Sequence, residues 1–535
     1  MSTRRTFLKQ NSVVAAGAWA ALSSPFAIKS AQAASTSTSP IADTTYGKLR
    51  GRTMDGIHVF RGIPYGADTS GKNRFMPPQK PSSWTGTRDA IEWGHVAPQP
   101  LPGSNYDYTN ACQWATQPGG KGEDCLVLNI STPGLKDGGK RAVMFAIHGG
   151  GYTTGTGQNP VFDGRALAHR GDVVVVSVNH RLGALGFTNL AEFAPEFAQS
   201  GVVGMMDLVL ALQWVHDNIA NFGGDPSRVM IFGQSGGGGK VCHLMTMPSA
   251  KGLFSRAAAQ SGATLRSGTR ENATKSAERL LKQLSLTKER FRVLQEAPFD
   301  MIIGAQGASG AQFGPMVDGT IIPRDPFDPD APAVSADVPM MAGSNLQDSN
   351  LSRTDFSIDD AAAQEQLKAS MGDATSKVWA AYREADPKAT APNLFARISS
   401  DQGIRTNTRM VIERKAALGR APSFLYLLKW QAPFMGGRYG SVHGTDVPLI
   451  LHNPELWPLT AGSPENRVLA DNMSDAFIAF AKNGTPGTKD LPWAAYEPNA
   501  KPTMVFDVHS GVENNPDRNL LAVLPERPRG RGLGF

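Results

Sequence analysis

The segment Gly233-Gln234-Ser235-Gly236-Gly237 could place a serine nucleophile on a sharp turn. It matches the pattern G-x-S-x-G, follows an apolar run and precedes a segment compatible with a helix, the setting in which this pattern marks a nucleophile. Glycines beside the serine permit a strained turn, because larger side chains would clash at a tight strand–helix corner. The helix that follows would direct its positive end at the hydroxyl. We therefore predict Ser235 to be the nucleophile of an acyl transfer.

A second glycine-rich segment, His148-Gly149-Gly150-Gly151, could stabilise the charge that this reaction creates. Attack on a carbonyl turns its oxygen into an anion, and losing one preorganised N–H donor typically costs roughly 2.7–4 kcal/mol. We predict the N–H groups of Gly150, Gly151 and Gly236 to be the donors, and we expect His148 to be structural. A phosphate-binding loop is the alternative, but no Lys-Ser/Thr pair of the P-loop type follows.

A serine hydroxyl also needs a general base, and the base needs an acid that orients it. Among the 10 histidines, His443 has the best setting, a loop after an expected strand near the end of the chain. The chain order serine, acid, histidine is typical of α/β hydrolases, so the acid should lie between the other two. Asp348 follows an expected strand directly, and Asp318 and Asp446 compete with it for the role.

Alternating strands and helices must hold these residues in place. The valine-rich run at 173–178 is typical of a strand buried on both faces, and the apolar residues of 208–219 share one helical face. The pattern predicts a large, mostly parallel central sheet flanked by helices, with helical insertions at 265–312 and 350–420 around the site. Further strands are expected at 141–147, 228–232, 338–342 and 424–430.

Composition and charge exclude several classes of partner. The chain has 535 residues, of which 41% are hydrophobic and 19% charged, as in ordinary soluble proteins. The formal net charge is +6, and four of its basic residues lie in the first 33 residues, which contain no acid. The remainder shows no nucleic-acid footprint. No H-E-x-x-H motif or Cys/His cluster is present, so we expect no metal and no cofactor.

The first 33 residues are typical of an export signal. Arg4 and Arg5 precede an apolar stretch at 13–22, and small residues at 31–33 offer a cleavage site. The paired arginines predict a twin-arginine signal, although an ordinary signal in which they only supply positive charge is the alternative.

These features give the expected organisation of the chain. The apolar stretch is too short to span a membrane, and we expect no later run of about 18 apolar residues. The mature protein should therefore be periplasmic or secreted, without a stable membrane anchor. The sequence leaves the choice between monomer and homodimer open. We expect a signal peptide at 1–33, a flexible linker at 34–42 and one folded domain at 43–535.

Several further segments resemble hallmarks of the type-B carboxylesterase/lipase family, and the resemblance extends from about residue 45 to about residue 507. It implies the α/β-hydrolase fold and the hydrolysis of small-molecule carboxylic esters through an acyl-enzyme, without a cofactor. Some members of this fold have lost the triad and serve as binding modules. The segments include FRGIPY at 60–65, EDCL at 123–126, NHRLG at 179–183, KGLF at 251–254 and QSG at 260–262.

The resemblance also assigns roles to individual residues. The family's acid follows the pattern G-x-N-x-D-E-G, and Asp348 occupies the position of its usual glutamate. Aspartate is one methylene shorter, so its loop must lie closer to His443, which matches the family's histidine. Asp446 matches a second acid that supports the histidine, and Ser261 matches a residue near the triad. The resemblance further implies structural ion pairs between Arg74 and Glu123 and between Arg181 and Asp207.

Two departures from the family bear on the site. Gln234 replaces a usual glutamate, which argues against a cholinesterase-like cation site, and Gly236 replaces a usual alanine but keeps its N–H donor.

The three cysteines leave one pairing open. An oxidising compartment permits a disulfide, and Cys112 and Cys125 are the natural pair because they close a short loop. The family's first disulfide cysteine is replaced by Ala97, so this pairing is uncertain. We expect Cys242 to be a buried free thiol.

Overall fold

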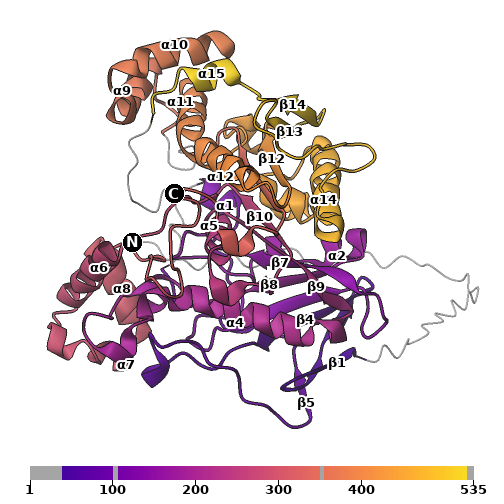
Figure 1. Cartoon of the computed structure of the whole chain (residues 1–535), viewed down its shortest axis with the longest axis vertical. Coiled ribbons are helices and arrows are strands. Elements are labelled where there is room, and N and C mark those ends of the chain that lie inside the picture. Colours follow the sequence, from indigo (N-terminus) through magenta and orange to yellow (C-terminus); the bar gives the residue numbers. More distant parts are fainter. Residues whose placement is uncertain (1–38, 101–106, 350–354, 527–535) are drawn as a thin grey trace, which may run out of the picture. The chain divides into compact units, whose positions relative to one another are not determined.

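The computed structural model describes residues 39–100, 107–349 and 355–526. A mixed sheet lies at its centre, and Figure 1 shows strands β7, β8 and β9 side by side in the interior. Its strands are, in spatial order, β14 (Gly511–Asn514), β13 (Pro502–Phe506), β12 (Ser423–Leu428), β11 (Met340–Asn345), β10 (Arg256–Gln260), β9 (Gly224–Gln234), β7 (Arg141–Ile147), β8 (Val174–Val178), β6 (Val127–Thr132), β4 (Ile57–Pro64) and β3 (Arg52–Met54).

The centre of this sheet is parallel and its edges are antiparallel. All neighbouring pairs from β13 through β8 are parallel. At the edges, β14 and the group β6, β4 and β3 pair in the antiparallel sense. The predicted α/β-hydrolase fold is confirmed. A parallel centre gathers the carboxyl ends of its strands at one edge of the sheet, where ligands bind in open α/β folds.

Residues of the central strands alternate between two hydrophobic cores, as the period of a strand requires. In β7, Phe145 and Ile147 pack into the first core, whereas Met144 and Ala146 pack into the second. In β8, Val174 and Val176 face the first core. The sheet is therefore covered on both faces, and this explains why its strands read as continuous apolar runs.

Different helices cover the two faces. The first core takes apolar side chains from α4 (Val203–Asn218), α5 (Gly236–Leu244) and α12 (Thr406–Ala417). The second takes them from α2 (Arg165–Gly171) and α14 (Glu465–Asn483). This helix–sheet–helix arrangement fixes α5, which begins at the predicted nucleophile, against the underlying strands β9 and β10.

Two helical insertions interrupt the regular alternation, as the sequence predicts. Between β10 and β11 lie α6 (Arg270–Gln283), α7 (Val293–Glu296) and α8 (Phe299–Ser309). Between β11 and β12 lie α9 (Asp360–Met371), α10 (Thr375–Ala385) and α11 (Ala391–Ser400). The second group has its own small core, which Leu520 and Leu524 complete from the segment around α15 (Arg518–Ala522); Figure 1 shows α15 beside α10 and α11.

The folded part begins earlier than expected. Strand β1 (Ile41–Thr44) pairs with β2 (Gly47–Arg50), which also pairs with β5 (Thr87–Asp89). Ala42 is fully buried, so residues 41 and 42 belong to the fold rather than to a flexible linker. The expected signal peptide at 1–33 lies outside the described residues.

One helical stretch of the described residues bears on the expectation about membrane spans. The helical stretch Pro195–Phe222 is long and apolar enough, by length and composition, to cross a membrane. However, 72% of its most apolar window is buried within the fold, because α4 packs Leu208, Leu212 and Val215 into the first core.

The two ion pairs implied by family resemblance are present and buried. Arg181 Nη2 lies 2.7 Å from Asp207 Oδ1, and Arg74 Nη2 lies 2.5 Å from Glu123 Oε2. Arg181 joins the end of β8 to α4 through this pair and also donates to the Met76 carbonyl.

Replacing Asp207 with alanine should destabilise the fold strongly, because it leaves the buried Arg181 guanidinium without a counter-charge. We expect the free energy of unfolding in urea to fall by about 3–5 kcal/mol. Glu271→Ala is the matched control, since the Lys275–Glu271 pair is exposed on α6, and it should leave the unfolding midpoint unchanged. Equal midpoints for both variants would contradict a structural role for the buried pair.

Candidate active site

Ser235 lies on a strained turn between β9 and α5. Its φ is 59° and its ψ is −127°, a conformation that costs a residue other than glycine roughly 1–3 kcal/mol. Its N–H donates to the Gln260 carbonyl at 2.8 Å, and its own carbonyl accepts from the Gly239 N–H at 3.1 Å. The next strand and the next helical turn therefore hold the strained residue from both sides. The predicted nucleophile turn is present.

The glycine loop after β7 touches this turn. Gly150 and Gly151 have φ values of 84° and 62°, which favour glycine. A Cβ atom on Gly236 would lie only 2.0 Å from the Gly151 carbonyl oxygen. Within the described residues, the N–H groups of Gly150, Gly151 and Gly236 donate no hydrogen bond. The structure thus brings the three predicted oxyanion donors to the corner that carries Ser235, with their N–H groups free.

Asp348 and His443 meet at the same edge of the sheet. Asp348 follows β11, His443 lies in the loop after β12, and His443 Nδ1 is 2.5 Å from Asp348 Oδ1. The second carboxylate oxygen accepts the Asn345 N–H at 2.8 Å. The Asp348 side chain is fully buried, whereas that of His443 is 21% exposed. The acid therefore fixes one edge of the imidazole ring, and part of the ring stays accessible to solvent.

The acid loop and the histidine loop are joined by a short set of hydrogen bonds. Asn345 Nδ2 donates to the Val442 carbonyl at 2.8 Å, and the Gln347 N–H donates to the Ser441 carbonyl at 3.1 Å. The Ser441 N–H returns to Gln347 Oε1 at 2.9 Å. Because these bonds set the separation of the loops, they let an aspartate reach His443.

One further contact comes from a distant segment. The Tyr108 hydroxyl, in α1 (Asp107–Ala111), donates to the His443 carbonyl at 2.6 Å. Tyr108 therefore supports the histidine loop although it lies 335 residues earlier in the chain. Sequence reasoning missed Tyr108, Asn345 and Gln347, although the asparagine of the acid motif was a signal for one of them.

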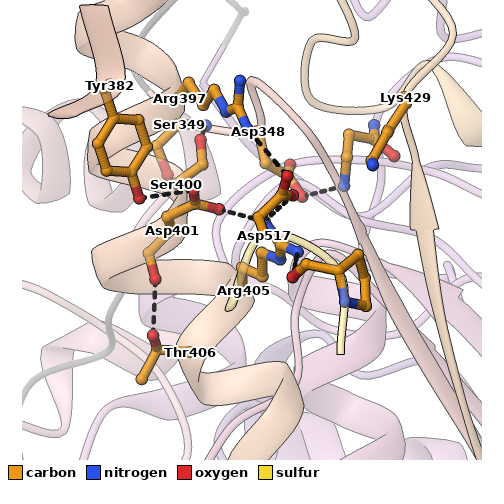
Figure 2. Close-up of polar contacts among 12 residues, drawn as sticks. Asp348, Ser349, Tyr382, Arg397, Ser400, Asp401, Arg405, Thr406, Lys429 and Asp517 are labelled. Carbon is orange, nitrogen blue, oxygen red and sulfur yellow. Dashed lines mark hydrogen bonds and ion pairs between the residues drawn. The ribbon is translucent and has the colours of Figure 1, made fainter. Parts of the chain in front are cut away.

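The residue after the acid is tied to a buried ionic network, which Figure 2 shows. The Ser349 N–H donates to Ser400 Oγ at 2.7 Å. Next to Ser400, the fully buried Asp401 accepts from the Tyr382 hydroxyl at 2.8 Å and from Arg405 at 2.9 Å. Arg405 also binds Asp517. The network spans a π-helical turn, Asp401–Arg405, and anchors the acid loop to the second helical insertion.

The remaining candidate acids have other partners. Asp318 accepts hydrogen bonds from the backbone of Thr320, Ile321 and Ile322, so it closes a turn. Asp446 is the first residue of α13 (Asp446–Ile450) and accepts from the Tyr426 hydroxyl at 3.0 Å. Its position beside the histidine loop matches the expected supporting acid.

Ser261 lies between the strands that carry the nucleophile and the acid. It follows β10 directly, and its N–H donates to the Gly343 carbonyl at 2.8 Å. Its hydroxyl is buried and has no partner among the described residues. Ser261 therefore lies near the predicted triad, as the sequence suggests, and its backbone hydrogen bond holds it there.

The described structure does not join Ser235 to His443 by a hydrogen bond. The two residues follow β9 and β12 at the same edge of the sheet, and Ser235 retains 9% exposure. Nucleophile–base hydrogen bonds are often long in the absence of substrate and tighten in the Michaelis complex.

The structure has no disulfide between Cys112 and Cys125, the pairing that the sequence left open, and all three cysteines are free and buried. Cys112 packs in the second core and Cys125 in the first. The two cysteines are therefore close in the sequence but lie in different cores. Burial raises the pKa of both thiols, and it raises that of Cys242 to about 12. Each is an inert core side chain, as expected for Cys242 alone.

Comparison with known proteins decides which fold family carries this site. The family described as the carboxylesterase family matches residues 38–523. The chain belongs to the carboxylesterase family. It is 31% identical to the para-nitrobenzyl esterase of Bacillus subtilis (strain 168) over 499 residues, which cover 90% of this chain and 97% of that protein. It is also 32% identical to the phenmedipham hydrolase of Pseudarthrobacter oxydans, over 86% of this chain and 93% of the relative.

Solved structures agree with this assignment. A carboxylesterase of Geobacillus stearothermophilus superimposes with a TM-score of 0.79 at 32% identity, covering 91% of this chain and all of that one. The chain is therefore a carboxylesterase that hydrolyses esters by the mechanism of serine hydrolases.

The charges around the histidine of this carboxylesterase favour its protonated form. Burial lowers the pKa of His443, but the charge and hydrogen bond of Asp348, followed by the charge of Asp446, raise it by more, so that the pKa lies above its ordinary value of 6.5. Burial and the charge of Asp348 raise the pKa of Asp446 to about 6, although the Tyr426 hydroxyl lowers it.

The carboxylesterase should therefore lose activity on the acid side with a midpoint above 6.5. Only neutral imidazole accepts a proton, so a raised pKa keeps His443, the predicted base, protonated up to a higher pH. The measurement is kcat/KM for an uncharged ester between pH 5 and 9. Asp446→Asn removes one raising charge and should move the midpoint to lower pH. A midpoint below 6.5 in the parent enzyme would contradict the charge arrangement described above.

Proposed function

We propose that Ser235, His443 and Asp348 form the catalytic triad of an exported carboxylesterase, with Gly150, Gly151 and Gly236 as its oxyanion hole. The observation that carries this proposal is geometric. A strained serine touches a glycine loop with free N–H groups, and a histidine hydrogen-bonded to a buried carboxylate follows a strand at the same sheet edge.

In the first half of the reaction, His443 Nε2 takes the proton of Ser235 as Oγ attacks the ester carbonyl. Asp348 accepts the Nδ1–H, which fixes the tautomer and stabilises the imidazolium that forms. The carbonyl oxygen becomes an anion and accepts hydrogen bonds from the three glycine N–H groups. The imidazolium then protonates the departing alcohol, leaving an acyl-serine.

In the second half, water attacks the acyl-serine, and His443 again takes and returns a proton. The acid leaves, and the free serine is restored. The nucleophile, the base, the acid and the oxyanion donors of this cycle all belong to the chain itself. The name of one relative, para-nitrobenzyl esterase, leads us to propose small aromatic esters as good substrates.

Ser235→Ala should abolish nearly all ester hydrolysis, because the alanine has no nucleophilic oxygen. We expect kcat on p-nitrophenyl butyrate to fall by roughly 10³-fold or more. Acetate, octanoate and palmitate esters should be tested beside it, since their relative rates separate an esterase from a lipase. Ser261→Ala is the matched control, and it should keep most of the activity. Undiminished hydrolysis by Ser235→Ala would sink the proposed nucleophile.

We also propose export of the folded protein through the twin-arginine pathway to the periplasm or the medium. The support from the sequence is Arg4-Arg5 ahead of an apolar stretch. The structure adds that its cysteines are buried free thiols, so folding before export requires no oxidising compartment.

Changing Arg4 and Arg5 together to lysine should retain the precursor in the cytoplasm, because the charge stays while the paired arginines are lost. Fractionation of a bacterial host followed by an esterase assay measures the outcome. The unchanged chain in a host without the twin-arginine translocon is the companion arm and should also be retained. Normal export in either arm would favour an ordinary signal peptide instead.

A further inference from the structure

Lys240 is buried in a place where its charge has little compensation. It lies in the second turn of α5, five residues after Ser235, and its relative exposure is 0%. Its ammonium group donates to the His148 carbonyl at 3.0 Å and lies 5.6 Å from the centre of the Tyr152 ring. Burial lowers the pKa of Lys240 to about 7. A buried cation with one hydrogen bond is costly to keep, which points to a use.

The other fully buried lysine of the described residues shows what a structural lysine looks like here. Lys415 in α12 donates to two carbonyls, those of Ser335 at 2.9 Å and Ala336 at 2.7 Å. These carbonyls end a short 3-10 helix, Ala333–Ser335, and need such donors. Lys415 therefore closes a helix end, whereas the partner of Lys240 begins the glycine loop.

The bond from Lys240 fixes the first peptide of that loop. Side chains of a helix lean toward its N-terminus, so Lys240 reaches back to the end of α5 that begins at Ser235. There it holds the carbonyl of His148, the residue that connects β7 to Gly149. A Cβ atom on Gly237 would lie 3.1 Å from the same carbonyl oxygen, which shows how closely loop and helix pack.

His148 fixes the next peptide in turn. Burial and then the charge of Lys240 keep the pKa of His148 well below its ordinary value, so the ring is neutral. Its Nδ1 lies 2.9 Å from the Gly149 carbonyl oxygen, and its Nε2 has no partner among the described residues. Nδ1 is therefore the protonated nitrogen and donates to that carbonyl.

The second of these bonds determines where the Gly150 N–H points, and the first holds the peptide that precedes it. In a trans peptide the C=O and N–H point in opposite directions. The peptide whose carbonyl accepts from His148 carries the Gly150 N–H, so that N–H points away from the buried imidazole. A hydrogen bond to the carbonyl also polarises the peptide and strengthens its N–H as a donor.

We propose that Lys240 is a positioning residue of the oxyanion hole, which holds the His148 carbonyl and through it the Gly149–Gly151 loop in the conformation that presents N–H groups to the oxyanion. This inference rests on the proposed function, because it needs Gly150 to act as an oxyanion donor. Lys240 does not touch the substrate.

The test compares Lys240→Met with Lys415→Met in the full chain. We expect Lys240→Met to lower kcat on p-nitrophenyl butyrate roughly 10- to 100-fold with little change in KM, since the loop acts in the transition state. The affinity for a trifluoromethyl ketone, whose adduct with the serine places an oxyanion in the hole, should fall by a similar factor. The melting temperature should not fall, because a buried cation has been removed.

Lys415→Met should show the opposite behaviour, with a lower melting temperature and a kcat near that of the parent. Lys240→Gln keeps a neutral donor and should have a kcat between those of the parent and Lys240→Met. If Lys240→Met does not fold, Lys240→Gln is compared with the parent in its place. Unchanged kcat and ketone affinity in the Lys240 variants would overturn the proposal. So would a loss of kcat that only accompanies a fall in melting temperature.

Ser235→Ala, tested in the same assays, distinguishes a failure of the Lys240 proposal from a failure of the proposed function. A parent enzyme that binds the ketone and a Ser235→Ala variant that does not would leave the proposed function standing, whatever the Lys240 variants do. Ketone binding and ester hydrolysis that survive in Ser235→Ala would overturn the proposed function, and the role of Lys240 would fall with it.

Discussion

The site depends on the contact between two backbone segments that have no side chains to separate them. A Cβ atom on Gly236 would lie 2.0 Å from the Gly151 carbonyl oxygen, and one on Gly262 would lie 1.8 Å from that of Ser235. Loop, turn and the end of β10 are therefore packed backbone against backbone around the strained serine. This packing stabilises a conformation that costs a serine roughly 1–3 kcal/mol, and it fixes the distance between the proposed nucleophile and the proposed oxyanion donors before any substrate arrives.

The proposed acid, Asp348, and the proposed base, His443, are held in another way. Their loops follow strands β11 and β12, which are neighbours, so the sheet brings them close without further help. The final separation is set by Asn345 and Gln347, which bond across to the histidine loop, and by the anchoring of Ser349 to Ser400. An aspartate can replace the family's usual glutamate because these contacts bring the two loops close together, so that the shorter side chain still reaches His443.

Sequence predicted the parts of this site that local rules determine. The glycines around Ser235 and the strands at 141–147 and 228–232 follow from turn sterics and apolar runs, and they lie as predicted. Sequence could not assign the disulfide, because spacing along the chain does not tell which core a cysteine enters. It likewise missed Lys240, since a lysine in a helix is exposed by default and only the packing of α5 on the glycine loop buries it.

The charges of the site are arranged for the proton transfer that ester hydrolysis requires. In the proposed mechanism, moving a proton from Ser235 to His443 creates a cation on one side of the site and an anion on the other. The cation forms beside Asp348 and Asp446, and the anion forms at the N-terminus of α5, the helix that also carries Lys240. A glutamate at position 234 would oppose this arrangement, because it would bring a negative charge close to the glycine loop. Gln234 Oε1 lies 3.2 Å from the position that a Cβ atom on Gly149 would occupy. The neutral glutamine therefore keeps negative charge away from the loop that is proposed to receive the oxyanion.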